Sequence, residues 1–202
     1  MLGAKPVHKS LYSRPAKPMR LTVTTRRQTA RIIAAAPKPL YVDRATECHI
    51  TPCAIAALMV DYLGPQTDGL TLEPSAGTGA LIAALVAAGY APARICAVER
   101  HNSLAARLSG DMAAQIYNRC FLDFAREHEG GLGFSRIVMN PPFRAVKAHI
   151  KAALSLLAED SAVMVALVPI TFEHDRAEPL QTLPRDTFST AQVATKLIRF
   201  ET

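Results

Sequence analysis

The sequence predicts an α/β fold in which a mostly parallel β-sheet is covered by helices on both faces. Three observations support this prediction. Short apolar runs alternate along the chain with longer segments in which apolar side chains recur at helical spacing. Turns rich in glycine and proline separate the two kinds of segment. Of the 202 residues, 50% are hydrophobic and 20% are charged, which is the composition of an ordinary globular domain.

Strands are expected where an apolar run is short and ends in a turn or a polar residue. The expected strands cover residues 70–73, 95–98, 116–121, 137–139, 161–168 and 193–200. The last of these runs alternates in polarity, which is typical of a strand at the edge of a sheet. Between residues 170 and 183 the sequence leaves room for one short helix only.

The first helix is expected to open at Thr51-Pro52, with the threonine as N-cap and the proline in the first turn, and to end at Gly64-Pro65. Three more helices are expected at residues 79–88, 103–112 and 147–157. In sheets of this kind, ligands bind beyond the carboxyl ends of the strands. The candidate functional motifs all follow expected strand ends.

The turn after the first strand reads Glu-Pro-Ser-Ala-Gly-Thr-Gly over residues 73–79. Its small residues let the backbone approach a ligand, and its glycines allow a sharp turn. It departs from the Gly-x-Gly-x-x-Gly pattern of nicotinamide-binding proteins, and no Gly-Lys-Ser/Thr follows as in a P-loop. Glu99 ends the second strand, at the position from which an acid accepts hydrogen bonds from ribose hydroxyls. The turn and Glu99 together predict a nucleoside site.

The third and fourth expected strands lead into two further candidates. Asp123 follows the third strand, from where it can bond an adenine amino group, with Phe121 or Phe124 available to cover the base. A helix cap is the alternative interpretation of Asp123. The fourth strand runs into Asn-Pro-Pro-Phe at 140–143, a sequence that elsewhere can be a plain exit from strand to loop.

Residues 1–40 are expected to form a basic, partly flexible arm, separate from a catalytic domain at 41–202. Residues 1–42 hold nine Lys and Arg and no acidic residue, so 14 of the 23 basic residues and all 17 acidic ones fall in the remainder. Prolines exclude continuous helix over most of the arm, and one short helix is expected at 25–35. The arm either contacts nucleic-acid phosphates or is a solvated tail that aids solubility.

Metal sites and membrane spans are not expected. The cysteines form no Cys-x-x-Cys pair, and no second pair of ligands follows Cys48, His49 and Cys53. No apolar run is long enough to cross a membrane, and the N-terminus lacks the pattern of a signal peptide. We therefore expect a cytoplasmic protein without a membrane partner.

The motifs at 73–79 and 140–143, in that order, resemble the S-adenosylmethionine-dependent methyltransferases that act on adenine N6 in DNA, with the motif order of their gamma class. Thr51-Pro52 is similar to the family motif that contacts the methionine carboxylate of the donor, and 183–188 with 193–200 are similar to its last strands. The resemblance covers the chain from Tyr41 onward. It implies a Rossmann-like class I methyltransferase fold: a mostly parallel seven-stranded sheet with an antiparallel edge strand and helices on both faces.

The resemblance also implies roles for individual residues. Those implied to hold S-adenosyl-L-methionine are Thr51, Glu73, Ser75, Ala76, Gly77, Gly79, Glu99, Asp123 and Phe124. The implied catalytic residues are Asn140, Pro141, Pro142 and Phe143. Candidate contacts to nucleic acid are Arg26, Arg27 and Arg31 in the arm and Lys147 after the catalytic motif.

An exocyclic amino nitrogen is a poor nucleophile because its lone pair is delocalised into the base. The Asn140 side-chain oxygen and the Pro141 carbonyl can each accept one of its N–H groups, which turns the lone pair toward the methyl donor. The prolines hold the acceptors in place before reaction, which is electrostatic preorganisation. Phe143 offers a ring on which a flipped base can stack, worth about 1–3 kcal/mol.

The chain departs from the family pattern after Phe143, where only 59 residues remain. That is too few to finish the sheet and add a target-recognition domain, so the enzyme would read a very short site, methylate with little specificity, or gain specificity from a partner protein or a homodimer. The same motif also serves N-methylation of RNA bases and of glutamine in proteins, which stay as alternatives. A non-enzymatic alternative is a nucleic-acid-binding protein with a degenerate methyltransferase fold.

Overall fold

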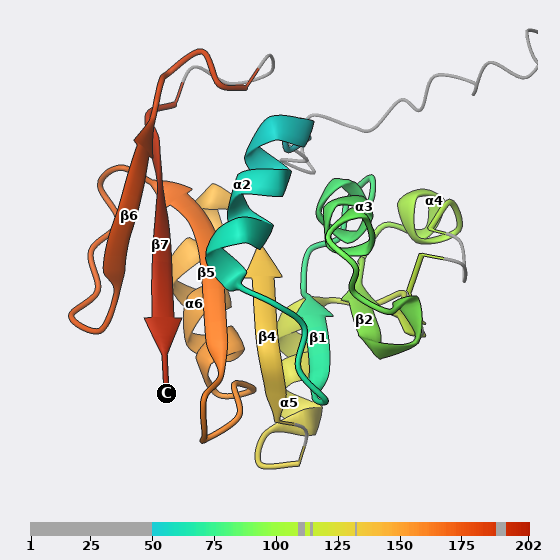
Figure 1. Cartoon of the computed structure of the whole chain (residues 1–202). Helices are drawn as coiled ribbons and strands as arrows, with labels where there is room; N and C mark the ends of the chain where they lie inside the picture. Colours follow the sequence, from blue (N-terminus) through green and yellow to red (C-terminus); the bar gives the residue numbers. More distant parts are fainter. Residues whose placement is uncertain (1–49, 109–111, 114, 132, 189–192) are drawn as a thin grey trace, which may run out of the picture. The chain divides into compact units, whose positions relative to one another are not determined.

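A computed structural model of the chain describes residues 50–108, 112–113, 115–131, 133–188 and 193–202. The expected helix at 25–35 and the arm residues Arg26, Arg27 and Arg31 lie outside these ranges. Seven strands form one sheet in the order β3-β2-β1-β4-β5-β7-β6 (Figure 1). The strands are β1 (Leu70–Glu73), β2 (Ile95–Val98), β3 (Gln115–Tyr117), β4 (Phe134–Met139), β5 (Val163–Pro169), β6 (Glu178–Leu183) and β7 (Thr195–Glu201).

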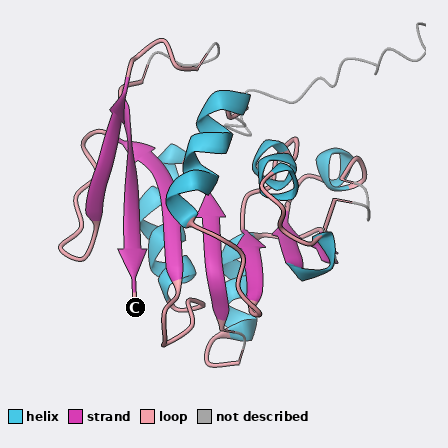
Figure 2. Cartoon of the chain, viewed as in Figure 1, coloured by secondary structure: helices cyan, strands magenta, loops and turns pink. Residues whose placement is uncertain are grey.

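Helices cover both faces of this sheet (Figure 2). They are α2 (Cys53–Leu63), α3 (Ala80–Ala87), α4 (Asn102–Ala105), α5 (Phe121–His128) and α6 (Val146–Leu154), with short 3-10 turns η3 (Pro92–Arg94) and η4 (Phe143–Ala145). None of the described helices is long and apolar enough to span a membrane.

The two faces of the sheet bury separate apolar cores. Along β5, Val163, Val165 and Leu167 pack with α2 and α3, while Met164 and Val168 pack with α5 and α6. Successive strand side chains point to opposite faces, so a strand covered on both sides is apolar throughout. This explains why the central strands appear in the sequence as continuous apolar runs. The predicted α/β sheet with helices on both faces is confirmed.

The strand directions correct part of the prediction. Four neighbouring pairs are parallel, but β7 runs antiparallel to both β5 and β6. The expectation of a mostly parallel sheet with one antiparallel edge strand is therefore wrong in detail: the reversed strand, expected at 193–200, lies inside the sheet, and β6 forms the edge.

Strand β6 occupies the region expected to hold only a short helix. Its sequence, Glu-Pro-Leu-Gln-Thr-Leu, is mostly exposed and carries no apolar run. Pro179 lacks a backbone N–H, which an edge strand tolerates, and the pairing register shifts between Pro179 and Gln181. The strand is held by its pairing with β7, which local sequence patterns do not reveal.

Two element boundaries differ from prediction near the candidate site. Thr51 is not the N-cap of the first helix: α2 begins at Cys53, with Pro52 as N-cap and no side-chain capping bond. The third strand ends at Tyr117, and α5 starts at Phe121 instead of the strand continuing to that residue. In α5 the apolar residues recur at helical spacing and Asp123 lies in the first turn, where negative charge is favourable.

Candidate active site

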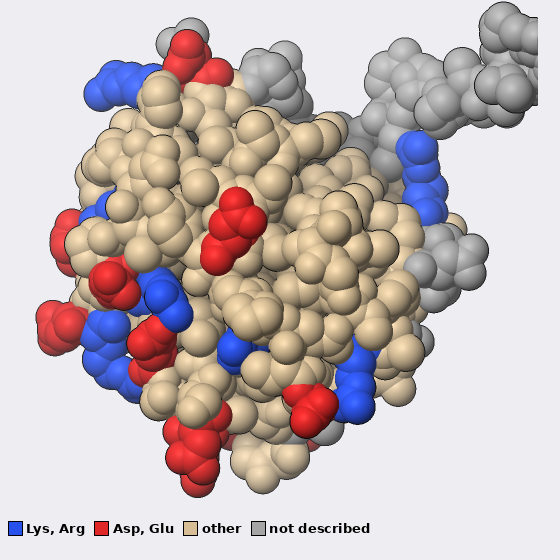
Figure 3. Space-filling view, in the orientation of Figure 1, with Lys and Arg blue, Asp and Glu red and all other residues tan. Residues whose placement is uncertain are grey.

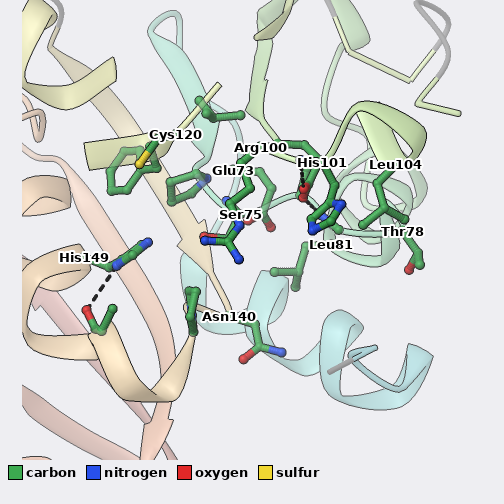
Figure 4. Close-up of a pocket in the computed structure, with 18 of the residues that line it drawn as sticks. Glu73, Ser75, Thr78, Leu81, Arg100, His101, Leu104, Cys120, Asn140 and His149 are labelled. Atoms are coloured by element: carbon green, nitrogen blue, oxygen red, sulfur yellow. Dashed lines mark hydrogen bonds between the residues drawn. The ribbon is translucent and has the colours of Figure 1, made fainter. Parts of the chain in front are cut away.

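A pocket of about 360 Å³ lies beyond the carboxyl ends of β1, β2 and β4 (Figure 4). This volume falls within the range of small-molecule sites, roughly 300–1,000 Å³. We call the part made by residues 73–78 and 98–101 the strand wall. The part made by residues 119–122 and His149 is the helix wall. Asn140 and Pro142 also line the pocket.

The strand wall begins with a tight turn after β1. The Ala76 backbone N–H donates to the Val98 carbonyl at 3.0 Å, which ties the turn to β2. Gly77 and Gly79 have φ values of 53° and 87°, a region that L side chains rarely adopt. A Cβ on Gly79 would lie 2.9 Å from the Leu108 side chain. The positive φ values therefore favour glycine at both positions, and at Gly79 a larger residue would also require the Leu108 side chain to move.

Glu99 joins this turn to the end of β2. Its side chain is only 8% exposed, and its two oxygens accept backbone N–H bonds from Gly77 at 2.8 Å and from His101 at 2.7 Å. These bonds hold the carboxylate in one orientation on the pocket wall. Each carboxylate oxygen has two acceptor sites. The group can therefore accept ligand hydroxyls while it keeps both backbone bonds.

Glu73 is fully buried at the base of the turn. Its Oε1 accepts the Ser75 N–H at 2.9 Å, while its Oε2 has no hydrogen-bond partner in the described part of the chain. Burial raises the pKa of this carboxyl from 4.5 to about 8, with a smaller contribution from Glu99 and an opposing one from the Ser75 bond. A buried acceptor without a partner costs about 1–3 kcal/mol. A ligand that donates a hydrogen bond here would remove that cost.

The end of β4 brings Asn140 to the pocket. Its Nδ2 donates to the Thr51 Oγ1 at 3.1 Å, which links the Asn-Pro-Pro-Phe segment to the chain two residues before α2. Thr51 is buried, as is Pro141, whereas Pro142 and Phe143 are half-buried. The hydrogen bond orients the Asn140 amide, and the prolines restrict the backbone that carries it.

Several predicted site residues do not reach the pocket lining. Asp123 is half-exposed and pairs with Arg126 at 2.8 Å, and Phe124 is buried against the rings of Tyr117 and His128. Both lie on α5, one turn or less beyond the part of it that lines the pocket. The lining also lacks Gly79, Pro141, Phe143 and the exposed Lys147.

The helix wall contains Phe121, one of the two rings that the sequence offers to cover the base, together with residues that the sequence does not assign to the site. Cys120, Phe121 and Leu122 line the pocket at the start of α5, and His149 lines it from α6. A signal for His149 exists in the sequence: it lies on the same helical face as the buried residues Val146, Ile150 and Ala153. In the described part of the chain, no group of His, Cys, Asp and Glu could hold a metal ion.

Comparison of the sequence with models of protein families and with curated proteins gives no match. The structure, in contrast, is similar to solved structures of methyltransferases. It superposes on a type I restriction-modification methyltransferase subunit from Streptococcus thermophilus with a TM-score of 0.63 and 19% identity, covering 76% of this chain and 44% of that one. The chain thus corresponds to less than half the length of that subunit.

Two further structures broaden this similarity. The 23S rRNA methyltransferase ErmE matches with a TM-score of 0.55 and 17% identity, over 72% of this chain and 66% of that one. A hypothetical protein of Thermus thermophilus matches with a TM-score of 0.61 and 20% identity, over 83% and 95% of the two chains. The chain has a methyltransferase fold.

Proposed function

We propose that this protein transfers a methyl group from S-adenosylmethionine to the exocyclic N6 amino group of adenine in DNA. The observation that carries the proposal is the position of Asn140, which is held by Thr51 on the same pocket that contains Glu73 and Glu99. When bound, S-adenosylmethionine supplies a methyl group activated by its sulfonium charge.

The strand wall fits the methionine and ribose parts of this cofactor. Glu73 presents a buried acceptor without a partner among the described residues, which suits the methionine ammonium group. Glu99 presents an oriented carboxylate at the end of β2, which suits ribose hydroxyls. The turn at 75–79 lets the backbone approach the ligand between these two acids.

The catalytic motif presents the target nitrogen. The Asn140 amide oxygen and the Pro141 carbonyl accept the two N–H groups of the amino group, so its lone pair turns toward the pocket that holds the donor. The bond to Thr51 and the restricted proline backbone keep the acceptors oriented, so little reorganisation is needed during reaction. Phe143, which starts η4, stacks on the extruded base.

DNA is the substrate favoured by the sequence resemblance, and the similarity to a restriction-modification subunit agrees with it. The face that carries α2 and α3 has few charged side chains (Figure 3). We assign phosphate contacts to Arg26, Arg27 and Arg31 of the basic arm, together with Lys147 on α6, because Lys and Arg gain by contact with nucleic-acid phosphates.

RNA is the second candidate substrate, because the fold also matches an rRNA methyltransferase. Incubation with methyl-labelled donor and equal masses of DNA, RNA and cell-extract protein separates the two, with Asn140→Ala as control. We expect label in DNA with the wild type only. Label confined to the RNA or the protein fraction would mean that RNA or protein, and not DNA, is the substrate. Donor binding without label in any fraction would favour a binding protein.

A further inference from the structure

The part of the pocket available to the adenine ring of the donor has no acidic side chain on the described residues that line it. Its two carboxylates, Glu73 and Glu99, belong to the strand wall. Asp123, the acid that the sequence analysis assigns to the adenine amino group, pairs with Arg126 outside the pocket. The amino group of adenine is a hydrogen-bond donor, so an acceptor on the helix wall would match it.

His149 offers an acceptor of this kind at its Nε2 atom. Its Nδ1 lies 3.0 Å from the Ala145 carbonyl, which can only accept a hydrogen bond. Nδ1 therefore carries the proton, and the Nε2 of the neutral ring is an acceptor. His149 is buried, with 8% of the residue exposed; it lines the pocket, and its ring packs on Phe121 with 5.7 Å between ring centroids. Figure 4 shows it with Cys120 on the side of the pocket opposite His101.

We propose that His149 Nε2 accepts a hydrogen bond from the amino group of the donor's adenine and so selects adenine at this position. This inference rests on the proposed function, because it concerns the same donor site. Phe121, packed beside the imidazole, gives the base an apolar surface. The residue is a binding and specificity residue and takes no part in the transfer of the methyl group.

The surroundings of His149 keep it in the accepting form. Burial lowers its pKa below the ordinary 6.5, against the bond to Ala145, and the positive charge of Arg100 lowers the pKa further. The remaining titratable side chains of the pocket wall are Glu73, Glu99, His101, Arg119, Cys120 and Arg144. At neutral pH the ring is therefore uncharged and accepts hydrogen bonds from an amino group, and it does not favour a carbonyl.

The test compares two ligands whose bases differ at this position and at the neighbouring N1, which is an acceptor in adenine and an N–H donor in hypoxanthine. S-adenosylhomocysteine carries the amino group, while S-inosylhomocysteine has a carbonyl in its place. By calorimetry at about pH 8, where imidazole is neutral, the wild type should bind the adenosyl ligand at least about tenfold more tightly. His149→Leu, which keeps an apolar side chain against Phe121, should reduce this preference to about twofold. His149→Gln, whose amide oxygen can accept, should restore part of it.

His128 provides a matched control. Its Nδ1 lies 2.8 Å from the Phe124 carbonyl, again four residues earlier, and its ring stacks on Phe124, but it does not line the pocket. His128→Leu should keep the full preference. In the wild type the preference should shrink once the pH is low enough to protonate His149, because the protonated ring is a donor. Titration of Glu73 changes the affinity for both ligands alike, so it cancels in the ratio of the two affinities.

The outcomes separate this inference from the proposed function. Equal wild-type affinity for the two ligands, or full preference retained in both His149→Leu and His149→Gln, overturns the role of His149 and leaves the donor site intact. A wild type that binds neither ligand overturns the donor site and, with it, the role of His149. Loss of preference in His149→Leu with retention in His128→Leu supports the inference.

Discussion

The two walls of the pocket are built in different ways. In the strand wall, two buried carboxylates are held by backbone N–H groups from the turn after β1 and from the end of β2. The helix wall presents the Arg119 guanidinium, a thiol, two apolar side chains and an imidazole from the N-terminal parts of α5 and α6 and the residues just before α5. The strand wall is thus suited to the charged and hydroxylated parts of a ligand, and the helix wall to a planar base.

The strand wall includes a destabilising group, whereas the described residues of the helix wall include no buried acid. Between pH 4.5 and about 8, folded Glu73 keeps a proton that the unfolded chain has lost. Its contribution to stability is therefore greatest below pH 4.5 and declines as the pH rises toward 8, by roughly 1.4 kcal/mol per pH unit. Glu73→Gln removes this titration.

Urea unfolding at a series of pH values checks this largest expected effect. The difference in the free energy of unfolding between Glu73→Gln and the wild type should increasingly favour the variant as the pH rises through that range. Asp123→Asn, at a half-exposed position, should show no such trend. A difference between Glu73→Gln and the wild type that stays constant with pH would contradict the burial of an unpaired carboxyl.

The next prediction compares Glu99 and Asp123, two acids that the sequence predicts in the same cofactor site. Glu99→Ala removes a carboxylate from the strand wall, and the affinity for S-adenosylhomocysteine should fall by about ten- to hundredfold. Asp123→Ala should leave the affinity unchanged, because Asp123 does not line the pocket. Calorimetric titration measures both. An equal loss of affinity in the two variants would mean that Asp123 also contributes to ligand binding.

Donor binding should release protons from the strand wall. Near pH 7 Glu73 is mostly protonated, and a bound ammonium group favours its ionised form. Calorimetry in buffers of different ionisation enthalpy should show release of close to one proton at about pH 7, falling away above the pKa of about 8. Glu73→Gln should release none and should bind the donor analogue about tenfold more weakly. Unchanged release in Glu73→Gln would assign the proton to another group.

The smallest effect concerns the contact that positions Asn140. Thr51→Val removes the hydroxyl that accepts from Asn140 Nδ2, and we expect about fivefold slower methyl transfer at saturating donor, from the loss of one hydrogen bond of about 1 kcal/mol. Thr67→Val removes a similar bond to Ser135 away from the pocket and should not change the rate. Equal rates in the two variants would show that the amide needs no support.

The same contrast explains how much could be predicted from the sequence. The strand wall depends on short stretches next to buried strands, so the turn at 73–79 and Glu99 are identifiable from local patterns. The helix wall depends on where α5 begins. If β3 continued to Phe121, as predicted, Asp123 would follow a strand end beside the pocket. Because α5 starts at Phe121, Asp123 instead lies on the helix and pairs with Arg126.

Long-range pairing accounts for the remaining differences. Strand β6 is mostly exposed and contains a proline, so only its pairing with β7 identifies it as a strand. The bond between Thr51 and Asn140 joins residues 89 positions apart, and Thr51 lies one position before Pro52, the N-cap of α2. Neither contact leaves a periodic signal in the sequence.

The central claim is that Asn140 presents the amino group of adenine to a donor bound beside it. The most direct test is to incubate DNA with methyl-labelled donor, digest it to nucleosides and identify the labelled product. We predict N6-methyladenine with the wild type and a reduction of at least about a hundredfold with Asn140→Ala, while the affinity for S-adenosylhomocysteine stays within about twofold. Label in another nucleoside, or normal methylation by Asn140→Ala, would contradict the claim.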